Sequence, residues 1–390
     1  MYITKCETVG AKSIAAEDML LTVGPPTTAG SKMLEGYQSL FEAEAVTRLK
    51  AAGYEMAGKA KVGEFAIDLL GETSYFGAEY ENDVLQSPAA MIVKSDNIPV
   101  VSLDVNGAVR RAAAQSGLCA LKPTYGTVSR YGTIPVACSG ETVSVLAGTP
   151  AVCGEVLCAM AGHDDKDGTS LADETVKSGK AGIVRKNKVA VLASMRKGAD
   201  ETVCAKLNAF AAALQSKGVE VVTVEADVVA FAGAAWNILM SAELCNNVSR
   251  YDGVKYGYRS QNFTNIDELY TASRTEAFGD LLKAAILFGS ETLATDNYQK
   301  VYDKALRVRR VISEAMNALL SEYDALLLPA VSTLAYAKET VENDKYMPYR
   351  ENFYTAPASI TGLPAVVADG VQLVGAAFSE DLLLSLAQLV

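Results

Sequence analysis

The 390-residue sequence contains a single histidine, His163, and this scarcity restricts the chemistry that the protein can perform. A Ser-His-Asp triad would have to use that one side chain, and a zinc site would find no second imidazole. His163 follows an apolar helical run that ends in Gly162, a pattern typical of a helix C-terminus. We therefore expect His163 to be a structural loop residue, and we expect no metal centre and no cofactor.

Cysteine motifs and long apolar runs are also missing. No two of the seven cysteines have C-x-x-C spacing, and the N-terminus has no apolar signal-peptide core. Most of the cysteines lie in apolar runs, so we expect buried free thiols in a reducing compartment. No uncharged apolar run reaches the roughly 18 residues that predict a membrane span. These absences predict a cytoplasmic protein without a membrane anchor.

The composition that remains is that of a globular protein. Half of the residues are apolar and 21% are charged, which predicts a sizeable core rather than disorder. The net charge of −11 argues against direct nucleic-acid binding, apart from a local basic patch for tRNA. The length fits one large domain or two ordinary ones. We expect a single domain over residues 1–390, with at most a subdomain boundary in the polar segment 164–186.

Helix and strand patterns alternate along the chain. Lys188–Leu192 and Glu220–Val224 are apolar strands, and an amphipathic helix over Thr202–Lys217 joins them. This strand–helix–strand unit predicts parallel pairing. Residues 228–246 and 279–320 have the pattern of long helices. The fold class that we predict is α/β, with a central mixed sheet surrounded by helices.

Five motifs occur in an order that indicates a known family. They are Ser31-Lys32-Met33-Leu34-Glu35, Gly58-Lys59 with Glu64-Phe65-Ala66, Leu121-Lys122-Pro123-Thr124-Tyr125-Gly126 with Val128-Ser129-Arg130-Tyr131-Gly132, Arg250-Tyr251-Asp252-Gly253-Val254-Lys255-Tyr256-Gly257, and Thr361-Gly362-Leu363-Pro364-Ala365. In this order they resemble the amidase-signature family, most closely the A subunits of the glutamyl-tRNA(Gln) and aspartyl-tRNA(Asn) amidotransferases. The resemblance implies a large mixed sheet covered by helices. It also implies that the family's N-terminal helices are absent here.

The resemblance implies a Ser–cis-Ser–Lys triad for amide hydrolysis, and the nucleophile position has changed. Its motif D-T-G-G-S-I-R falls on residues 104–110. Asp104, Gly107 and Arg110 remain, Asn106 replaces a glycine, and Ala108 replaces the serine. Alanine has no oxygen to attack a carbonyl carbon. Asp104 and Arg110 could form a functional pair or a structural remnant, and we favour the remnant.

The other two triad positions differ as well. The nearest counterpart of the bridging serine is Gln86, within a stretch that has no glycine between Gly77 and Gly107. Glu17 stands where the family has its lysine base. The arginine and aspartate that hold glutamine in the family correspond to Ala285 and Asn352. An alanine cannot replace the bidentate pairing of arginine with a carboxylate.

These differences predict a catalytically degenerate protein that binds a partner or a ligand in the old pocket. The partner would be an amidotransferase B-like subunit or an active paralogue. The alternative is an active amidase or glutamine amidotransferase A subunit with displaced groups, for which Ser87, Lys94, Ser95 and Ser102 are the nearby candidates. We interpret Lys94, Ser95 and Ser102 as solvated surface residues. A decaying gene copy without a selected role is a third interpretation, which the intact apolar periodicity disfavours.

Overall fold

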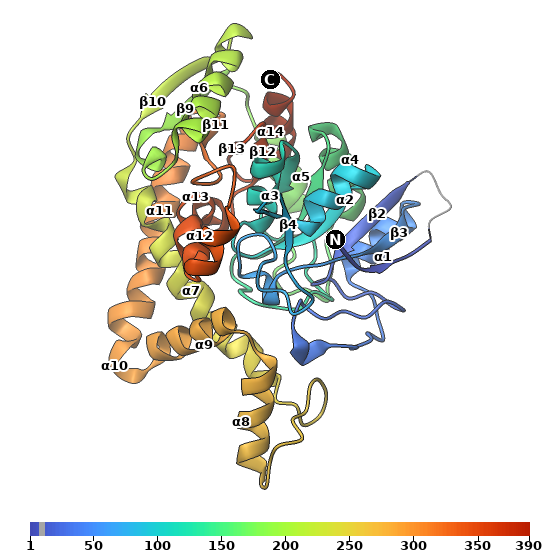
Figure 1. The fold of residues 1–390 in the computed structure, drawn as a ribbon. Coiled ribbons are helices and arrows are strands. Elements are labelled where there is room, and N and C mark those ends of the chain that lie inside the picture. Colours follow the sequence, from blue (N-terminus) through green and yellow to red (C-terminus); the bar gives the residue numbers. More distant parts are fainter. Residues whose placement is uncertain (8–11) are drawn as a thin grey trace.

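An eleven-stranded mixed sheet forms the centre of the computed structural model, which describes residues 1–7 and 12–390 (Figure 1). Its strands follow the order β1 (Tyr2–Lys5), β3 (Glu55–Ala60), β2 (Ser13–Glu17), β6 (Val100–Asp104), β8 (Thr142–Ala147), β7 (Cys119–Lys122), β12 (Ala365–Ala368), β13 (Val371–Val374), β11 (Ala325–Pro329), β9 (Lys188–Leu192) and β10 (Glu220–Val224). β2 is parallel to both β3 and β6, and β9 is parallel to both β10 and β11. The other pairs are antiparallel, so the predicted mixed sheet is confirmed.

The central strands contribute to two apolar cores, because neighbouring strand residues point to opposite faces. Val101 and Leu121 belong to one core, and their neighbours Val100 and Ala120 belong to the other. The helices α2 (Pro88–Asp96) and α3 (Ala108–Ser116) contact the central strands on one side. The helices α1 (Glu44–Ala51), α4 (Pro150–Met160) and α14 (Glu380–Ala387) pack together and cover the other side. Burial on both faces explains why these strands are continuous apolar runs.

The predicted strand–helix–strand unit is confirmed. α6 (Glu201–Ser216) joins β9 to β10, and Asp200 caps it by accepting a hydrogen bond from the backbone N–H of Val203 at 2.7 Å. The stretch over 279–320 is helical as predicted, but it is not a single helix. α9 (Asp280–Leu293) ends at Ala294, whose φ of −58° and ψ of 144° are not helical. The chain then forms α10 (Thr295–Asn297), a π-helical turn over Tyr298–Tyr302, and α11 (Asp303–Glu322).

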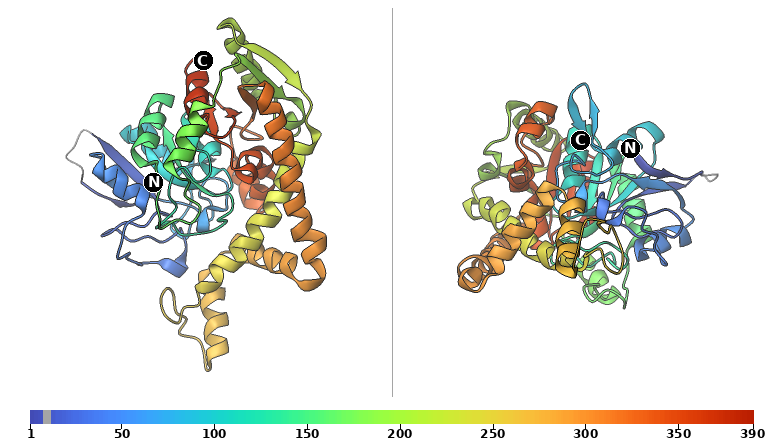
Figure 2. Two further views of the ribbon diagram at one scale, coloured as in Figure 1. Left: turned by 180° about the vertical axis from the view of Figure 1, so that it is seen from behind. Right: turned by 60° about the horizontal axis from the view of Figure 1, so that its bottom comes forward.

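A layer of helices lies beside the sheet, and one helix projects from it. α7 (Ala232–Asn247) contacts α9, α11 and α13 (Met347–Thr361), and its Trp236 is fully buried. α8 (Ile266–Ala277) extends away from the body, as Figures 1 and 2 show. Among the described residues, one helical stretch, Asp227–Arg250, is long and apolar enough to span a membrane, and 56% of its most apolar window is buried. That burial is typical of a core helix.

The remaining elements connect these layers. They are a hairpin of β4 (Glu79–Glu81) and β5 (Val84–Gln86), α5 (Asp173–Ala181) and α12 (Lys338–Asn343). α5 lies within the polar segment 164–186, and strands of the same sheet precede and follow that segment.

Candidate functional site

The turn between β6 and α3 holds the position at which the resemblance places the nucleophile. Ala108 is the first residue of α3, directly after this turn, and Glu17 is the last residue of the neighbouring strand β2. Glu17 and Ala108 line one small cavity together with Ser87 and Ser102. The structure thus brings together two of the three predicted triad positions. Gln86, the last residue of β5, does not line this cavity, and its amide instead donates to the carbonyl oxygen of Val84 at 3.3 Å.

This cavity, the Ala108 cavity, is nearly closed. Its volume is about 10 Å³. A cavity needs roughly 10–15 Å³ to hold a single water molecule. Small and apolar residues occupy much of its wall, namely Val62, Gly63, Leu70, Gly71, Pro88, Ala89, Val109 and Ala112. A carboxamide group is several times larger than a water molecule and does not fit in this space.

Glu17 is a neutral acid in this environment rather than a base. Its side chain is buried, and one carboxyl oxygen accepts a hydrogen bond from the backbone N–H of Leu103 at 3.2 Å. Burial raises the pKa of Glu17 to about 8, and the nearby carboxylates of Asp68 and Asp104 act in the same direction. At neutral pH most of its population is therefore protonated.

The serine hydroxyls of the Ala108 cavity have no lysine base. Ser87 caps α2, where its Oγ accepts from the backbone N–H of Ala90 at 3.3 Å. Lys61 also lines the cavity, but its amine pairs with Glu79 and donates to the carbonyl oxygen of Gly77 at 3.3 Å. No hydrogen bond joins a serine hydroxyl to a lysine amine within residues 1–7 and 12–390. A proton relay of the family's kind needs such a contact.

The surface interpretation of Ser102 is wrong. Ser102 is fully buried on β6, and its Oγ has no hydrogen-bond partner among the described residues. The apolar runs on both sides of the serine, together with its central strand, explain this burial. Lys94 and Ser95 are exposed as predicted and lie on the last turn of α2.

The turn before Ala108 is filled by a network of buried side chains. Asn106 donates to the carbonyl oxygen of Ile67 at 2.6 Å, and Arg111 donates to the carbonyl oxygen of Asn106 at 2.8 Å. Gly107 has a φ of +93°, and a Cβ at this position would lie 2.3 Å from the Cβ of Thr355. The hydroxyl of Thr355 in turn donates to the carbonyl oxygen of Asn106 at 2.8 Å. This packing holds the turn rigidly against α13.

Asp104 and Arg110 form a fully buried ion pair. The guanidinium donates to both carboxylate oxygens, at 2.8 and 3.1 Å. It also donates to the carbonyl oxygen of Thr355, to Gln372 Oε1 and to Ser359 Oγ, at 2.6, 2.8 and 2.7 Å. The pair therefore ties β6 and α3 to α13 and β13. This geometry supports the interpretation of Asp104 and Arg110 as a structural remnant.

The loop over residues 68–73 separates the Ala108 cavity from a second, larger one. Asp68 accepts from both the backbone N–H and the hydroxyl of Thr73, each at 2.9 Å. Glu72 accepts from the backbone N–H groups of Leu69 and Leu70, at 2.8 and 3.0 Å. Burial raises the pKa of Glu72 to about 8, and the carboxylate of Asp68 adds to the rise. These hydrogen bonds within the loop make it a compact wall between the two cavities.

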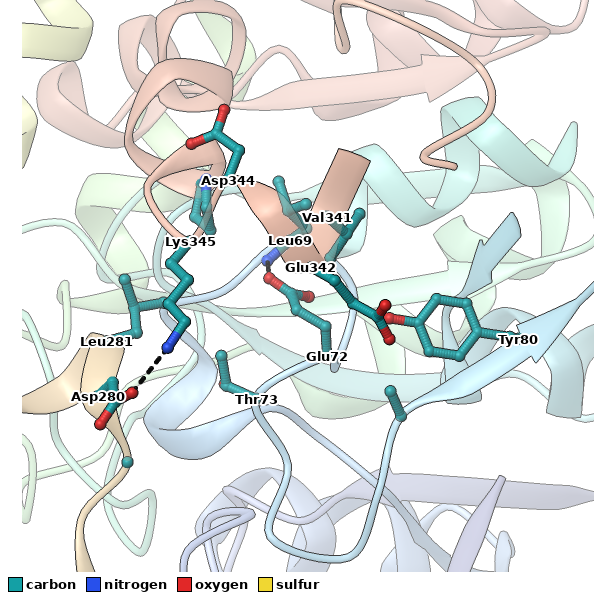
Figure 3. Close-up of a pocket in the computed structure, with 13 residues that line it drawn as sticks. Leu69, Glu72, Thr73, Tyr80, Asp280, Leu281, Val341, Glu342, Asp344 and Lys345 are labelled. Carbon is teal, nitrogen blue, oxygen red and sulfur yellow. Dashed lines mark hydrogen bonds and ion pairs between the residues drawn. The ribbon is translucent and has the colours of Figure 1, made fainter. Parts of the chain in front are cut away.

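The larger cavity, which we call the outer pocket, has a volume of about 420 Å³ and is lined by Leu69, Glu72, Thr73, Ala78, Tyr80, Gly279, Asp280, Leu281, Val341, Glu342, Asp344, Lys345 and Pro348. Lys345 reaches across to Asp280 with a 2.9 Å ion pair, as Figure 3 shows. Figure 3 also shows Glu72 held against the backbone of Leu69. The outer pocket is large enough for a small molecule, whereas the Ala108 cavity is not.

The two positions at which the resemblance places the glutamine-binding residues are buried inside helices. Ala285 lies on α9, one turn after Leu281 of the outer pocket, and Asn352 lies on α13, one turn after Pro348. Neither residue lines the outer pocket. Asn352 donates to Asn237 Oδ1 at 2.6 Å, and its own Oδ1 has no partner among the described residues. These positions therefore hold no charged group for an amino acid.

Two buried lysines have the lowered pKa expected of a catalytic base, and sequence reasoning gave them no role. Burial lowers the pKa of Lys59 to about 8, and it lowers the pKa of Lys122 to about 7. Lys59 pairs with Asp18 at 3.6 Å, and Lys122 donates to the carbonyl oxygen of Leu363 at 3.0 Å. Both belong to motifs that carry the resemblance, but neither lines the Ala108 cavity.

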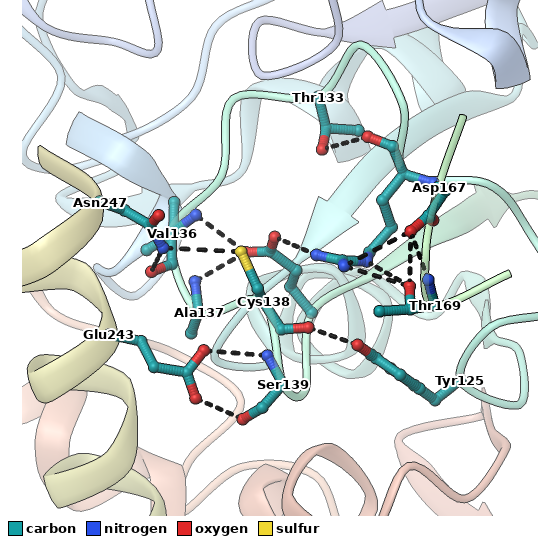
Figure 4. Close-up of polar contacts among 12 residues, drawn as sticks. Tyr125, Thr133, Val136, Ala137, Cys138, Ser139, Asp167, Thr169, Glu243 and Asn247 are labelled. Atoms are coloured by element: carbon teal, nitrogen blue, oxygen red, sulfur yellow. Dashed lines mark hydrogen bonds and ion pairs between the residues drawn. The ribbon is translucent and has the colours of Figure 1, made fainter. Parts of the chain in front are cut away.

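The most complete motif, around Arg130, forms a structural junction. Arg130 donates to Glu141 at 2.8 Å, and Glu141 also accepts from the backbone N–H groups of Val136 and Ala137, at 3.0 and 2.7 Å. Glu243 of α7 accepts from the backbone N–H and hydroxyl of Ser139 in the same network (Figure 4). The junction joins the loop that carries Arg130 and Ser139 to α7 in the helical layer.

Histidine and cysteine lie outside these cavities. His163 lies in the turn after α4, and its ring contacts Asp165 at 3.0 Å. All seven cysteines are free, but the expectation of burial is wrong for most, since only Cys119 and Cys153 are buried and Cys158 is exposed. Cys158 faces outward because α4 covers the sheet with one side only. Within the described part of the chain, no three His, Cys, Asp or Glu residues are placed to hold a metal ion.

Comparisons with known proteins agree with this architecture. The amidase family model matches residues 14–80 and 101–384. The A subunit of the glutamyl-tRNA(Gln) amidotransferase of Latilactobacillus sakei subsp. sakei is 34% identical, over 94% of this chain and 80% of that protein. The corresponding protein of Agathobacter rectalis is 33% identical, over 94% and 77%. The crystal structure of the Thermotoga maritima A subunit superposes with a TM-score of 0.81 at 26% identity, over 100% of this chain and 86% of that one. The chain belongs to the amidase-signature family and is related to the amidotransferase A subunits.

Proposed function

We propose that this protein is a non-catalytic member of its family that acts as a binding or partner subunit. The observation that carries the proposal is the small Ala108 cavity, about 10 Å³ in volume, at the position where the resemblance places the family's nucleophile. Ala108 offers no attacking oxygen, and a protonated Glu17 accepts no proton from a neighbouring hydroxyl. Each of these features independently opposes amide hydrolysis.

An assay for ammonia release from glutamine and from simple amides tests this proposal. The Latilactobacillus sakei protein, which is related over 94% of this chain, is assayed beside it for comparison. We expect no turnover above background from the purified protein. We also expect none from Glu17→Lys/Ala108→Ser, because these changes do not enlarge the cavity. Sustained turnover by the unmodified protein would overturn the proposal.

A second candidate function is an amidase with displaced catalytic groups. It is favoured by one observation, the buried hydroxyl of Ser102, which lines the Ala108 cavity without a hydrogen-bond partner. If this hydroxyl were the nucleophile, Ser102→Ala would abolish turnover. Ser95→Ala serves as the matched control, since Ser95 is exposed on α2.

The relatives are named as subunits, which supports a role in an assembly. We propose a cytoplasmic role in which the chain associates with an amidotransferase B-like subunit or with an active paralogue. The outer pocket leaves room for a small-molecule ligand as well. Co-expression with the B subunit of the same genome, followed by size-exclusion chromatography, tests the association. Separate elution of the two proteins at micromolar concentration would count against a B-like partner.

A further inference from the structure

The motif at residues 250–257 forms part of a further cavity, and none of its residues lines the Ala108 cavity or the outer pocket. Arg250, Tyr251 and Tyr256 line this cavity, which we call the tyrosine pocket and which has a volume of about 230 Å³. The apolar part of its wall consists of Leu21, Leu34, Ile134 and Pro135. Among the described residues, no carboxylate lines it. An apolar pocket with a few polar groups is typical of a small-molecule site.

Tyr251 supplies a hydroxyl that the protein leaves without a partner. The residue is only 6% exposed, and its ring packs against Phe65 and Tyr256 with centroid separations of 5.4 and 6.1 Å. The hydroxyl forms no hydrogen bond with any described residue. It is not sealed in the interior as the hydroxyl of Ser102 is, because Tyr251 meets open space in the tyrosine pocket. Since buried polar groups are normally hydrogen-bonded, this hydroxyl indicates a partner that enters from outside the chain.

Arg250 is the charged group of the tyrosine pocket, and its charge is not neutralised. Its guanidinium donates to the carbonyl oxygen and to the amide oxygen of Asn247, at 2.8 and 3.2 Å, and both acceptors are uncharged. Within residues 1–7 and 12–390 it forms no ion pair. Burial raises the pKa of Tyr251, while the nearby charge of Arg250 acts in the opposite direction. The two donors therefore face the same pocket, and the hydroxyl is protonated at neutral pH.

The other hydroxyls of the tyrosine pocket complete its set of donors. Thr133 and Tyr256 use their protons within the protein, since they donate to the backbone carbonyl oxygens of Arg130 and Arg250, at 2.8 and 3.3 Å. Tyr37 adds a second hydroxyl that has no hydrogen-bond partner in the described part of the chain. The pocket thus offers unused donors and a positive charge, and its chemical complement is a negatively charged group that accepts hydrogen bonds.

The loop that carries these groups is held in place before any ligand binds. Arg274 of α8 donates to the carbonyl oxygens of Val248 and Tyr251, at 3.1 and 2.9 Å. Further along the loop, the backbone N–H of Tyr258 donates to the carbonyl oxygen of Met33 at 2.8 Å. Binding therefore requires little reordering of the chain, and a site that is formed in advance binds more tightly.

We propose that the tyrosine pocket binds a small organic carboxylate with a compact apolar body, such as a phenyl ring. The carboxylate accepts from the Tyr251 hydroxyl and pairs with Arg250, and the body packs against the apolar wall. Hydrogen bonds to an ionised group are the strong ones, so these two donors distinguish the acid from a neutral analogue. A cation finds no charged acceptor in this pocket, and a polyanion finds one guanidinium. The site is separate from the Ala108 cavity, so the inference does not rest on the proposed function.

Fluorine NMR titration with para-fluorophenylacetate tests the site. The corresponding amide, para-fluorophenylacetamide, is the neutral analogue, and para-fluorophenethylamine is the cation. We expect the acid to bind with a dissociation constant below about 1 mM, in keeping with its small size. The amide should bind at least about tenfold more weakly, because it lacks the charge that both donors recognise. The amine should show no binding.

Tyr251→Phe and Arg250→Gln are the decisive variants. Tyr251→Phe keeps the ring and removes only the hydroxyl, so it should bind the acid about tenfold more weakly than the unmodified protein does. It should unfold at the same urea concentration, because the hydroxyl has no partner in the free protein. Arg250→Gln should weaken binding of the acid at least about tenfold and binding of the amide little. Tyr258→Phe and Arg259→Gln are the matched controls on the same loop, and they should leave the affinity unchanged because neither residue lines the pocket.

The absence of binding at about 10 mM acid would overturn the proposal, since this concentration lies tenfold above the expected limit. Equal affinity for the acid and the amide would overturn it as well. So would a folded Tyr251→Phe variant that binds the acid as tightly as the unmodified protein does, or a control that weakens binding as much as Tyr251→Phe.

Discussion

Arg110→Met should reveal how strongly the buried pair with Asp104 holds the fold together. The guanidinium and the carboxylate are both fully buried, and they form two hydrogen bonds at 2.8 and 3.1 Å. Methionine fills much of the same space but leaves the carboxylate without a cation. Breaking a buried pair on one side costs about 3–5 kcal/mol. We expect a loss of this size in the free energy of unfolding at pH 7.

The loss should depend on pH in a defined direction. Burial would by itself raise the pKa of Asp104, but Arg110 outweighs it and holds the pKa below its usual value. In the unmodified protein this pair therefore stabilises the fold above the unfolded pKa of about 3.9, and the contribution fades as pH falls. In Arg110→Met burial dominates, the pKa of Asp104 rises above about 3.9, and the variant loses further stability as pH increases. The difference in the free energy of unfolding between the unmodified protein and Arg110→Met should thus increase from pH 4 to pH 7.

Urea unfolding at several pH values measures both effects. Adding Asp104→Asn to Arg110→Met removes the unpaired buried charge. The double variant should therefore be more stable than Arg110→Met at pH 7, and this gain in stability should be smaller at pH 5. If Arg110→Met lowers the free energy of unfolding by less than about 1 kcal/mol at pH 7, the reasoning is refuted, since an exposed ion pair contributes that much to stability. A loss that does not change with pH would refute it as well.

Other substitutions test the turn and the Ala108 cavity. Gly107→Ala should lower the free energy of unfolding by about 2–4 kcal/mol, because φ at this position is +93° and the new Cβ would lie 2.3 Å from Thr355. Gly36→Ala is the matched control, since its φ is +74° but no atom lies near its Cβ, and it should cost only about 1 kcal/mol. Equal losses for the two variants in urea unfolding would contradict this reasoning. Burial raises the pKa of Glu17 to about 8, so its contribution to stability is present below the unfolded pKa and declines as pH rises toward 8. Glu17→Gln should flatten this decline, by up to about 1.4 kcal/mol per pH unit, and an unchanged pH profile would show that Glu17 does not titrate there. Ser102→Ala should leave stability unchanged or raise it by about 1 kcal/mol, because the buried hydroxyl has no partner, and a clear loss would reveal a hydrogen bond.

Much of the fold was predictable because its signals are local. The apolar run at 188–192 became a buried strand, since a strand buried on both faces needs a continuous apolar run, and the run at 220–224 became its parallel neighbour at the edge of the sheet. The amphipathic helix that joins them followed in the same way. The break at Ala294 was not predictable, because its neighbours keep a helical pattern and the bend is set by packing of α9 and α11 against α7.

In the candidate site, too, the local features were predictable and the features set by tertiary packing were not. The sequence by itself determined that residue 108 carries no nucleophilic oxygen and that residue 17 is an acid, because these are facts of side-chain chemistry, and the resemblance implies that they stand at the family's nucleophile and lysine positions. Only the tertiary structure decided that the two residues share a cavity of about 10 Å³ and that Ser102 is buried there. The residues that close the site come from segments far apart in the chain, and their mutual packing leaves no signature in local periodicity. A sequence pattern records which face of an element is apolar, whereas the volume left between elements depends on how they assemble.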